Sequence, residues 1–228
     1  MKERTFNTLF MLSSVDGKIS TGDIVERDFD KDLLKLKGAN EGLQQYYDLE
    51  KRTDIHSFNT GRVMAKIGMN EKKTISKIPV SFIIVDNKPH LTLQGVNNML
   101  KWCKKLYLVT TNKNHPAFQI NSDNLEVITQ TRFDAQKLFL QLKEQYDIKR
   151  VTIQSGGEMN ALLIRAGLID RVSIVFAPIL VGGRTTPTLI DGDALRSEKD
   201  LKLIKTLKLD KITKLKGSYL HVTYKVIN

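Results

Sequence analysis

The chain has 228 residues, of which 41% are hydrophobic, and its formal net charge is +11. This length suits one α/β domain or at most two small ones, and the apolar content is enough for a sizeable core. No apolar run approaches the roughly 20 residues that cross a bilayer, and the N-terminus lacks the apolar core of a signal peptide, which excludes these membrane and export signals. The single cysteine, Cys103, cannot form an internal disulfide, so the sequence predicts a reducing, cytoplasmic location.

The positive charge has three interpretations. It favours nucleic-acid binding, a site for phosphorylated ligands, or simply a solvated surface rich in lysine. The lysines are spread along the chain, and no tight basic tract alternates with aromatic residues. Nucleic acid is therefore the least favoured of the three interpretations, and the other two stay open.

Short apolar and β-branched runs separated by polar segments fill the first two thirds of the chain. They predict strands at 5–14, 54–59, 80–85, 106–111 and 125–128. Helical spacing predicts helices at 30–37, 41–52, 95–103 and 134–146, the last capped by Asp134. Thr60 is expected to cap a further short helix that begins at the turn after the second strand.

The stretch 151–170 has the pattern of a strand, a glycine turn and a helix. Gly156 and Gly157 let the backbone turn sharply and let a ligand approach it closely. A helix that starts at such a turn offers free N–H groups and the positive end of its dipole, which favours phosphate. A plain strand-to-helix turn is the alternative. The expected apolar helix face consists of Leu162, Leu163 and Ala166, and Gly167 is expected to end the helix.

The C-terminal third predicts strands at 171–177, 201–209 and 218–227, with an irregular glycine loop at 178–184. The last strand alternates almost perfectly, which is typical of an antiparallel edge strand. We therefore expect an α/β fold in a single domain, residues 1–228. Its sheet should be mixed and mostly parallel, with helices on both faces and an antiparallel C-terminal part.

Charged residues follow the first strand, where α/β sheets tend to bind ligands. Asp16 and Lys18 flank Gly17 there, although an ordinary turn with two solvated charges is the alternative. The four histidines are scattered without metal-ligand spacing, so no metal site is expected. Neither a serine nucleophile elbow nor a P-loop lysine is present. The remaining parts suit a reductase, in which a nicotinamide cofactor carries the hydride and the protein supplies position and electrostatics.

Several motifs, in order and at suitable spacing, resemble those of the riboflavin-biosynthesis reductases, the family of the C-terminal domain of the bifunctional deaminase-reductase. They are SVDGKI at 14–19, GGEMN at 156–160, AGLID at 166–170, APILVGG at 177–183, and the pairs 187–188 and 191–192. The resemblance covers nearly the whole chain. It implies a dihydrofolate-reductase-like fold, usually a homodimer, that uses NADPH to reduce the ribosyl group of 5-amino-6-(5-phosphoribosylamino)uracil to ribityl.

The resemblance also implies roles for individual residues. Asp16 and Lys18 are the expected catalytic residues, and Ser14 and Gln154 are the expected contacts to the phosphorylated substrate. Asp86 matches an aspartate that follows the third strand of the family. The expected cofactor contacts are Thr60, Gly61, Arg62, Val63, Thr111, Ser155, Gly156, Gly157 and Glu158.

Several positions depart from the family pattern, and the arginine-alanine pair that the family has before Asp54 is missing. Arg62 replaces a threonine, Lys66 lies near a usual aspartate, and Gln154 stands where a glutamate often precedes the glycines. The added positive charge could bind the 2′-phosphate of the cofactor or a phosphate of the substrate. The same changes are also compatible with a reductase of this fold that acts on a pterin, a folate or another heterocycle. A nucleic-acid binder without a cofactor is the remaining alternative.

Overall fold

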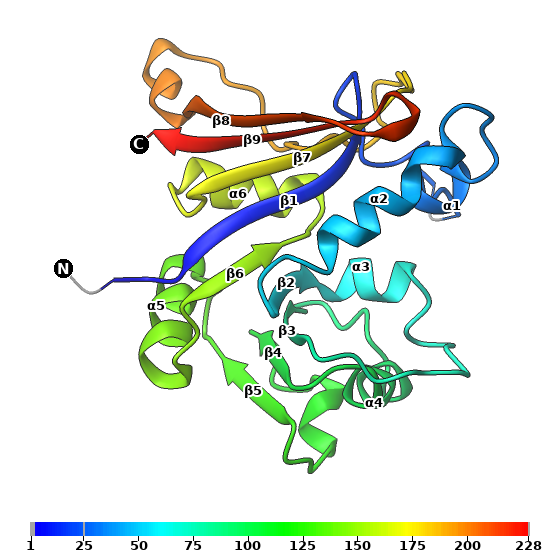
Figure 1. Ribbon diagram of the computed structural model, residues 1–228. Coiled ribbons are helices and arrows are strands. Elements are labelled where there is room, and N and C mark those ends of the chain that lie inside the picture. The colour runs from blue at the N-terminus through cyan, green and yellow to red at the C-terminus, as the bar shows by residue number, and fades with distance from the viewer. Residues whose placement is uncertain (1–2, 25, 228) are drawn as a thin grey trace. The chain divides into compact units, whose positions relative to one another are not determined.

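The computed structural model describes residues 3–24 and 26–227, which form two compact units (Figure 1). Unit 1 contains the start of the chain up to Thr5 and residues 54–155, and unit 2 contains residues 6–53 and 156–228. Each unit is described by itself below. The expectation of one reductase domain over the whole chain stays a prediction.

Unit 1 contains five parallel strands in the order β5-β4-β3-β2-β6. They are β2 (His56–Thr60), β3 (Ser81–Val85), β4 (Leu106–Thr110), β5 (Leu125–Thr129) and β6 (Arg150–Ile153). Thr60 pairs with Val85, and Val85 pairs with Val109, so these strands end together. Their carboxyl ends therefore form one continuous edge, which is where ligands bind in parallel α/β sheets.

Three α-helices of unit 1 begin at side-chain caps. They are α3 (Gly61–Lys66), α4 (Leu93–Trp102) and α5 (Ala135–Tyr146), and η1 (Pro116–Gln119) is a short 3-10 turn. Thr60, Thr92 and Asp134 each accept a hydrogen bond from the N–H group three residues later. The predicted caps at Thr60 and Asp134 are confirmed.

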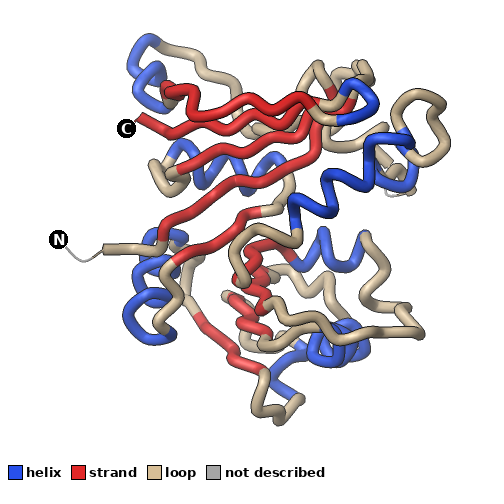
Figure 2. Tube along the Cα trace, viewed as in Figure 1, coloured by secondary structure: helices blue, strands red, loops and turns tan. Residues whose placement is uncertain are grey.

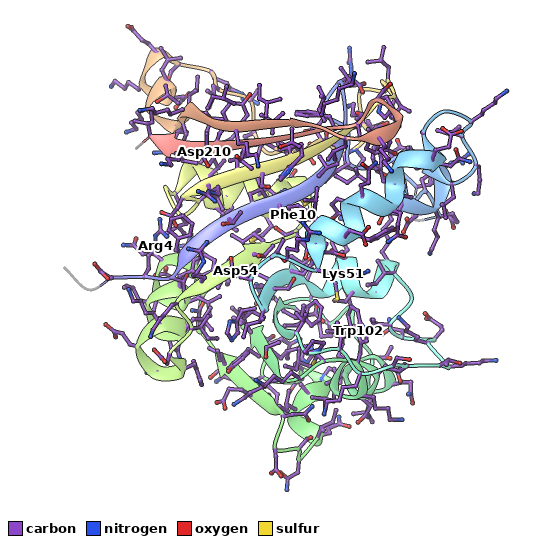
Figure 3. The ribbon with its side chains drawn as sticks, viewed as in Figure 1. Arg4, Phe10, Lys51, Asp54, Trp102 and Asp210 are labelled. Carbon is purple, nitrogen blue, oxygen red and sulfur yellow. The ribbon has the colours of Figure 1, made fainter. Side chains whose placement is uncertain are left out.

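The core of unit 1 lies beside α4. Trp102, which is labelled in Figure 3, lies at the end of that helix. Its ring stacks on that of Phe82 with the centroids 4.7 Å apart. Cys103 follows it and is fully buried in the same apolar cluster. Burial raises the pKa of the Cys103 thiol to about 12, so this residue is a packed core residue rather than a reactive thiol.

Unit 2 contains four strands, which lie side by side in the order β1-β7-β9-β8 (Figure 1). They are β1 (Phe6–Ser14), β7 (Arg171–Ala177), β8 (Thr206–Lys214) and β9 (Leu220–Ile227). β1 and β7 are parallel, whereas β9 is antiparallel to both β7 and β8. The prediction that the last strand forms an edge is wrong, because β8 pairs along its outer side and is itself the edge.

Local hydrogen bonds explain a second difference from expectation. The strand predicted from Leu201 begins only at Thr206, because residues 198–203 form a 3-10 turn, η2 (Glu198–Leu203). A reciprocal capping box between Ser197 and Asp200 starts that turn. The side-chain hydrogen bonds at the cap thus override the alternating apolar pattern.

The helices of unit 2 are α1 (Phe29–Leu33), α2 (Asn40–Glu50) and α6 (Gly157–Arg165), with a 3-10 turn η3 (Lys216–Ser218). Phe10 of β1 stacks on Tyr46 of α2 with ring centroids 5.2 Å apart. In α6, Leu163 is buried, but Leu162 is 43% exposed and Ala166 is exposed as well, so the predicted apolar face is wrong at these two positions. Gly167 follows α6 with φ +68°, a left-handed conformation that glycine favours at helix ends.

Strands and helices alternate through much of the chain (Figure 2). The parallel strands of unit 1 and the antiparallel C-terminal strands of unit 2 together confirm the predicted α/β class, with mostly parallel, mixed strand pairing. Among the described residues, no helix combines the length and apolar character that a bilayer crossing requires.

Candidate functional site

The turn after β1 is held by its own side chains. The hydroxyl of Ser14 donates to Oδ1 of Asp16 at 2.6 Å, and the Lys18 N–H donates to the Ser14 oxygen at 2.8 Å. Gly17 has φ +80°, which lets the chain reverse between the two charged residues. Residues 14–18 therefore form a compact loop with fixed side chains rather than an ordinary solvated turn.

The Asp16 carboxylate binds the main chain of the glycine loop. The N–H groups of Val181 and Gly182 donate to its two oxygens at 3.1 and 2.7 Å. The hydrogen bond from Ser14, assisted by those from Gly182 and Val181, lowers the pKa of Asp16 to about 2. Asp16 is thus a carboxylate near neutral pH and cannot serve there as a proton donor.

Lys18 binds the same loop with the opposite charge. Its side chain is buried, and Nζ donates to the carbonyl oxygens of Gly183 at 2.7 Å and Thr186 at 2.9 Å. An ammonium group has three N–H donors, and the described residues supply two acceptors, so one donor remains for a further acceptor. We refer to Ser14, Asp16 and Lys18 with the loop 181–186 as the clasp.

The start of α6 has the features of an anion site. Gly156 is the N-cap, and no side chain of the described residues caps the helix. A Cβ atom added to Gly156 would meet nothing within 4 Å, so the space beside its backbone is open. The first N–H groups of α6 therefore lack a side-chain acceptor and can bind an anion such as phosphate. Glu158, in the first turn, has an exposed side chain.

Gly157 differs from its neighbour. A Cβ atom there would collide with the carbonyl oxygen of Thr188 and the carboxylate of Asp191. The Asp191 N–H donates to the Gly157 carbonyl oxygen at 3.1 Å, which keeps this segment against α6. Internal packing alone therefore requires glycine at 157, whereas Gly156 has the open space that close approach of a ligand needs.

The predicted site residues of unit 1 follow the carboxyl ends of its strands. Thr60 caps α3, and the exposed Arg62 lies in the first turn of that helix. The Thr111 N–H donates to Oδ1 of Asn87 at 2.9 Å. Oε1 of Gln154 accepts a hydrogen bond from the Ser57 hydroxyl at 3.1 Å, and the neighbouring Ser155 is buried. These residues occupy the strand ends at which a ligand would bind.

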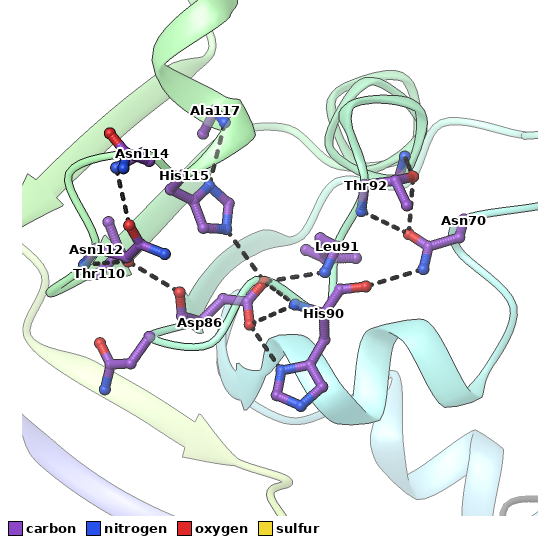
Figure 4. A network of polar contacts seen from close by, with 12 residues as sticks. Asn70, Asp86, His90, Leu91, Thr92, Thr110, Asn112, Asn114, His115 and Ala117 are labelled. Atoms are coloured by element: carbon purple, nitrogen blue, oxygen red, sulfur yellow. Dashed lines mark hydrogen bonds and ion pairs between the residues drawn. The ribbon is translucent and has the colours of Figure 1, made fainter.

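Asp86 is the centre of a buried polar network in unit 1 (Figure 4). Its carboxylate accepts hydrogen bonds from the N–H groups of His90 and Leu91 and contacts Nδ1 of His90 at 3.0 Å and Nε2 of His115 at 3.1 Å. Burial alone would raise the pKa of Asp86, but the bonds from His115, Leu91 and His90 hold it below its usual value.

This network bears on the expected cofactor loop. A Cβ atom at Gly61 would collide with the Asp86 carboxylate, so the carboxylate lies directly against the start of α3. Sequence reasoning missed His90 and His115, and the available signal was weak: His90 follows Asp86 by four residues. Within residues 3–24 and 26–227, no group of three or more His, Cys, Asp or Glu side chains could hold a metal ion.

The sequence matches a known family over most of its length. Residues 5–220 match the family of the RibD C-terminal domain, and the chain therefore belongs to this family. The expected resemblance is thus confirmed. Family membership implies a nicotinamide cofactor, and the open, uncapped start of α6 suits a phosphate-bearing ligand of this kind.

Two archaeal relatives are both named 2,5-diamino-6-ribosylamino-4(3H)-pyrimidinone 5′-phosphate reductase. The protein of Methanothermobacter thermautotrophicus is 32% identical over 74 residues, which cover 32% of this chain and 34% of the relative. That of Archaeoglobus fulgidus is 33% identical over 55 residues, covering 24% of this chain and 25% of the relative. These alignments span about a third or less of either relative.

Solved structures of low sequence identity share the fold. Acinetobacter baumannii RibD superposes with a TM-score of 0.69 at 16% identity, covering 99% of this chain and 59% of that chain. The riboflavin biosynthesis reductase Rib7 of Saccharomyces cerevisiae gives 0.61 at 17% identity, covering 98% and 90%. The expected fold of the riboflavin-biosynthesis reductases is therefore confirmed.

Replacing Ser14 tests the electrostatics of the clasp. In Ser14→Ala, we expect the pKa of Asp16 to rise from about 2 toward its usual value, because the largest stabilising hydrogen bond is lost. Carboxyl ¹³C NMR titration measures this pKa directly. Asp32, whose pKa of about 2 depends first on Lys35, is the internal control and should not move. An unchanged Asp16 pKa would contradict the assigned cause.

Proposed function

We propose that this chain is an NADPH-dependent reductase of riboflavin biosynthesis that reduces the ribosyl group of a phosphoribosylaminopyrimidine to ribityl. The observation that carries the proposal is the clasp, in a chain of the RibD C-terminal family. It holds a buried ammonium group at the end of a strand with one N–H donor unused. A cationic donor of this kind suits a reaction in which charge changes on the substrate.

The names of related proteins suggest two closely similar substrates. The archaeal relatives are named for 2,5-diamino-6-ribosylamino-4(3H)-pyrimidinone 5′-phosphate. A Thermotoga maritima structure of the same fold is named a diaminohydroxyphosphoribosylaminopyrimidine deaminase/5-amino-6-(5-phosphoribosylamino)uracil reductase. We propose the uracil as substrate and the diaminopyrimidinone as the second candidate. Assaying turnover of both, with a pterin and a folate, separates these options from another heterocycle.

In the proposed reaction, a bound nicotinamide cofactor would supply a hydride to C1′ of the opened, imine-like sugar, and the sugar nitrogen would take the balancing proton from water, either directly or through the Lys18 ammonium group. Lys18 is the residue expected to contact the substrate, through the N–H donor that Gly183 and Thr186 leave free. Asp16 positions the loop through its hydrogen bonds to Val181 and Gly182 and passes no proton, since its pKa is about 2. Ser14 fixes both charged residues and is the further proposed substrate neighbour.

We propose cofactor contacts for each unit by itself. In unit 2, the open backbone at Gly156 and the first N–H groups of α6, including that of Glu158, are expected to bind phosphate. In unit 1, residues 60–63 together with Thr111 and Ser155 stand at strand ends. The exposed cation Arg62 is the candidate for the 2′-phosphate that distinguishes NADPH from NADH, and Gln154 is the proposed substrate contact of this unit.

Lys18→Met tests the proposed role of the ammonium group. We expect kcat to fall by about 100-fold or more, as when a donor to developing charge is removed, with the Kd for NADPH changed less than about threefold. Steady-state kinetics and calorimetry measure the two quantities. Asp16→Asn is the matched control. It weakens the hydrogen bonds to the loop but keeps the ammonium group of Lys18, so its decrease in kcat should be smaller. An equal decrease in kcat in both variants would show that the position of the loop, and not the ammonium group, determines turnover.

A cofactor titration tests the proposed phosphate site at the start of α6. We expect tight binding of NADPH and weaker binding of NADH, with a smaller difference in Arg62→Ala. Gly156→Ala should weaken NADPH binding at unchanged thermal stability, because its Cβ enters open space. Gly157→Ala should instead lower stability by about 1–3 kcal/mol through the clash with Thr188 and Asp191. Full NADPH affinity in Gly156→Ala would refute the phosphate site at the start of α6. If the unmodified chain binds neither NADPH nor NADH, the proposed reductase function is refuted.

We further propose a homodimer formed through the uncovered face of β8. Leu207, Leu209 and Ile212 share one face with Val226, Tyr224 and Val222 of β9, their partners in the register. The three β8 side chains are 43%, 50% and 57% exposed. A second copy of the chain would cover such an apolar strand face, which is otherwise an aggregation hazard.

Leu209→Lys combined with Ile212→Lys tests this interface. We expect a dimer mass for the unmodified chain and a monomer mass for the double variant, because the new charges cannot be buried without partners. Light scattering after size-exclusion chromatography measures both masses. Lys208→Glu, on the opposite face of β8, should leave the dimer intact. A monomeric unmodified chain, or a double variant of dimer mass, would exclude this interface.

A further inference from the structure

A hollow of about 500 Å³ lies in unit 1 between α4 and the loop that follows α3. It is lined by Asn70, Glu71, Lys72, Lys73, Ile75, Gln94, Asn98 and Lys101. Its volume falls within the range of about 300–1,000 Å³ that is typical of small-molecule sites. None of these residues belongs to the clasp, to α6 or to the expected cofactor contacts.

One wall of the hollow is a single stripe of α4. Gln94, Asn98 and Lys101 are spaced four and three residues apart, so they project from one side of the helix. Asn98 is buried, and its amide donates to the Met69 carbonyl oxygen at 2.7 Å and to that of Lys72 at 3.1 Å. The backbone that carries the loop lysines is therefore fixed to the helix.

A second amide, that of Asn70, fixes the same segment of the loop from within (Figure 4). Oδ1 of Asn70 accepts hydrogen bonds from the N–H and hydroxyl of Thr92, and its amide donates to the His90 carbonyl oxygen at 2.9 Å. Gly95 permits this approach, because a Cβ atom there would collide with the Asn70 oxygen. Because residues 69–72 are fixed by both amides, this segment has little backbone freedom to lose when a ligand binds.

The charges around the hollow are unbalanced. Lys72, Lys73 and Lys101 supply three ammonium groups, against the one carboxylate of Glu71. Nζ of Lys72 lies 5.1 Å from the centroid of the Trp102 ring, which orients that side chain. In the part of the chain that the structure describes, none of these three lysines forms an ion pair, unlike Lys35 and Lys143.

We propose that this hollow binds the phosphate groups of a small phosphorylated molecule. Like charges converging on a pre-formed concave surface raise the local concentration of anions. Phosphate oxygens can accept hydrogen bonds from several ammonium groups at once, and Gln94 and Asn70 add amides on the rim. The proposal goes beyond the reductase function and concerns a second ligand site in unit 1.

The single tryptophan of the chain, Trp102, reports on this site. Inorganic pyrophosphate is titrated into the full chain at constant ionic strength, and Trp102 emission is followed. We expect a saturable change, because an anion that binds Lys72 alters the charge next to the indole ring. In the double variant Lys73→Ala/Lys101→Ala, the midpoint should rise at least about tenfold, since two charge-assisted hydrogen bonds are lost.

The double variant Lys199→Ala/Lys202→Ala provides the matched control. It removes two exposed lysines of unit 2, outside the hollow, and should keep the midpoint of the unmodified chain. Three results would overturn the proposal. These are no saturable change in the unmodified chain, an equal response in Lys73→Ala/Lys101→Ala, or a change that potassium chloride reproduces.

Discussion

The opposed charges of the clasp are the constraint on which the strand-end chemistry of unit 2 depends. Asp16 accepts hydrogen bonds from loop N–H groups, whereas Lys18 donates to loop carbonyl oxygens, so two segments about 165 residues apart in sequence are held together. An antiparallel bridge at Lys18 and Thr188 extends the contact. Its hydrogen bonds run from the Ile19 N–H to the Pro187 carbonyl oxygen and from the Leu189 N–H to the Gly17 carbonyl oxygen. Because Thr188 in turn packs against Gly157, the clasp also positions the start of α6. The same contacts thus position both the ammonium group of Lys18 and the proposed phosphate site at the start of α6.

Asp86 has a comparable role in unit 1, with a single buried charge. A buried carboxylate is costly unless hydrogen bonds satisfy it, and here His90, Leu91 and His115 supply them. Since the carboxylate also rests on Gly61, it joins the ends of β3 and β2 and the loop before α4 into one rigid edge. In both units, buried or oriented charge gives irregular loops a defined geometry at the strand ends.

The sequence predicted those strands and helix caps that depend on neighbouring residues. The strand at 5–14 and the caps at Thr60 and Asp134 follow from apolar runs and cap chemistry, and the motifs around Asp16 and Gly156 located the strand-end segments. The late start of β8 at Thr206 has a local cause, the capping box before it, but the other failures depend on distant partners. Alternation in residues 218–227 could not reveal that β8 pairs outside β9, and the sequence could not show which carbonyl oxygens bind Lys18. His115 joins Asp86 only through the tertiary fold, because 29 residues separate them.

The burial of Cys103 makes this thiol a probe of how often the core of unit 1 opens. Its thiol is fully buried and has a pKa of about 12, so thiolate is scarce near neutral pH and alkylating reagents are shut out while the core is closed. It is also the only cysteine of the chain. Its rate of alkylation therefore measures how often the core beside α4 opens, with no background from unit 2. A bound ligand that stabilises this core would lower the alkylation rate of Cys103.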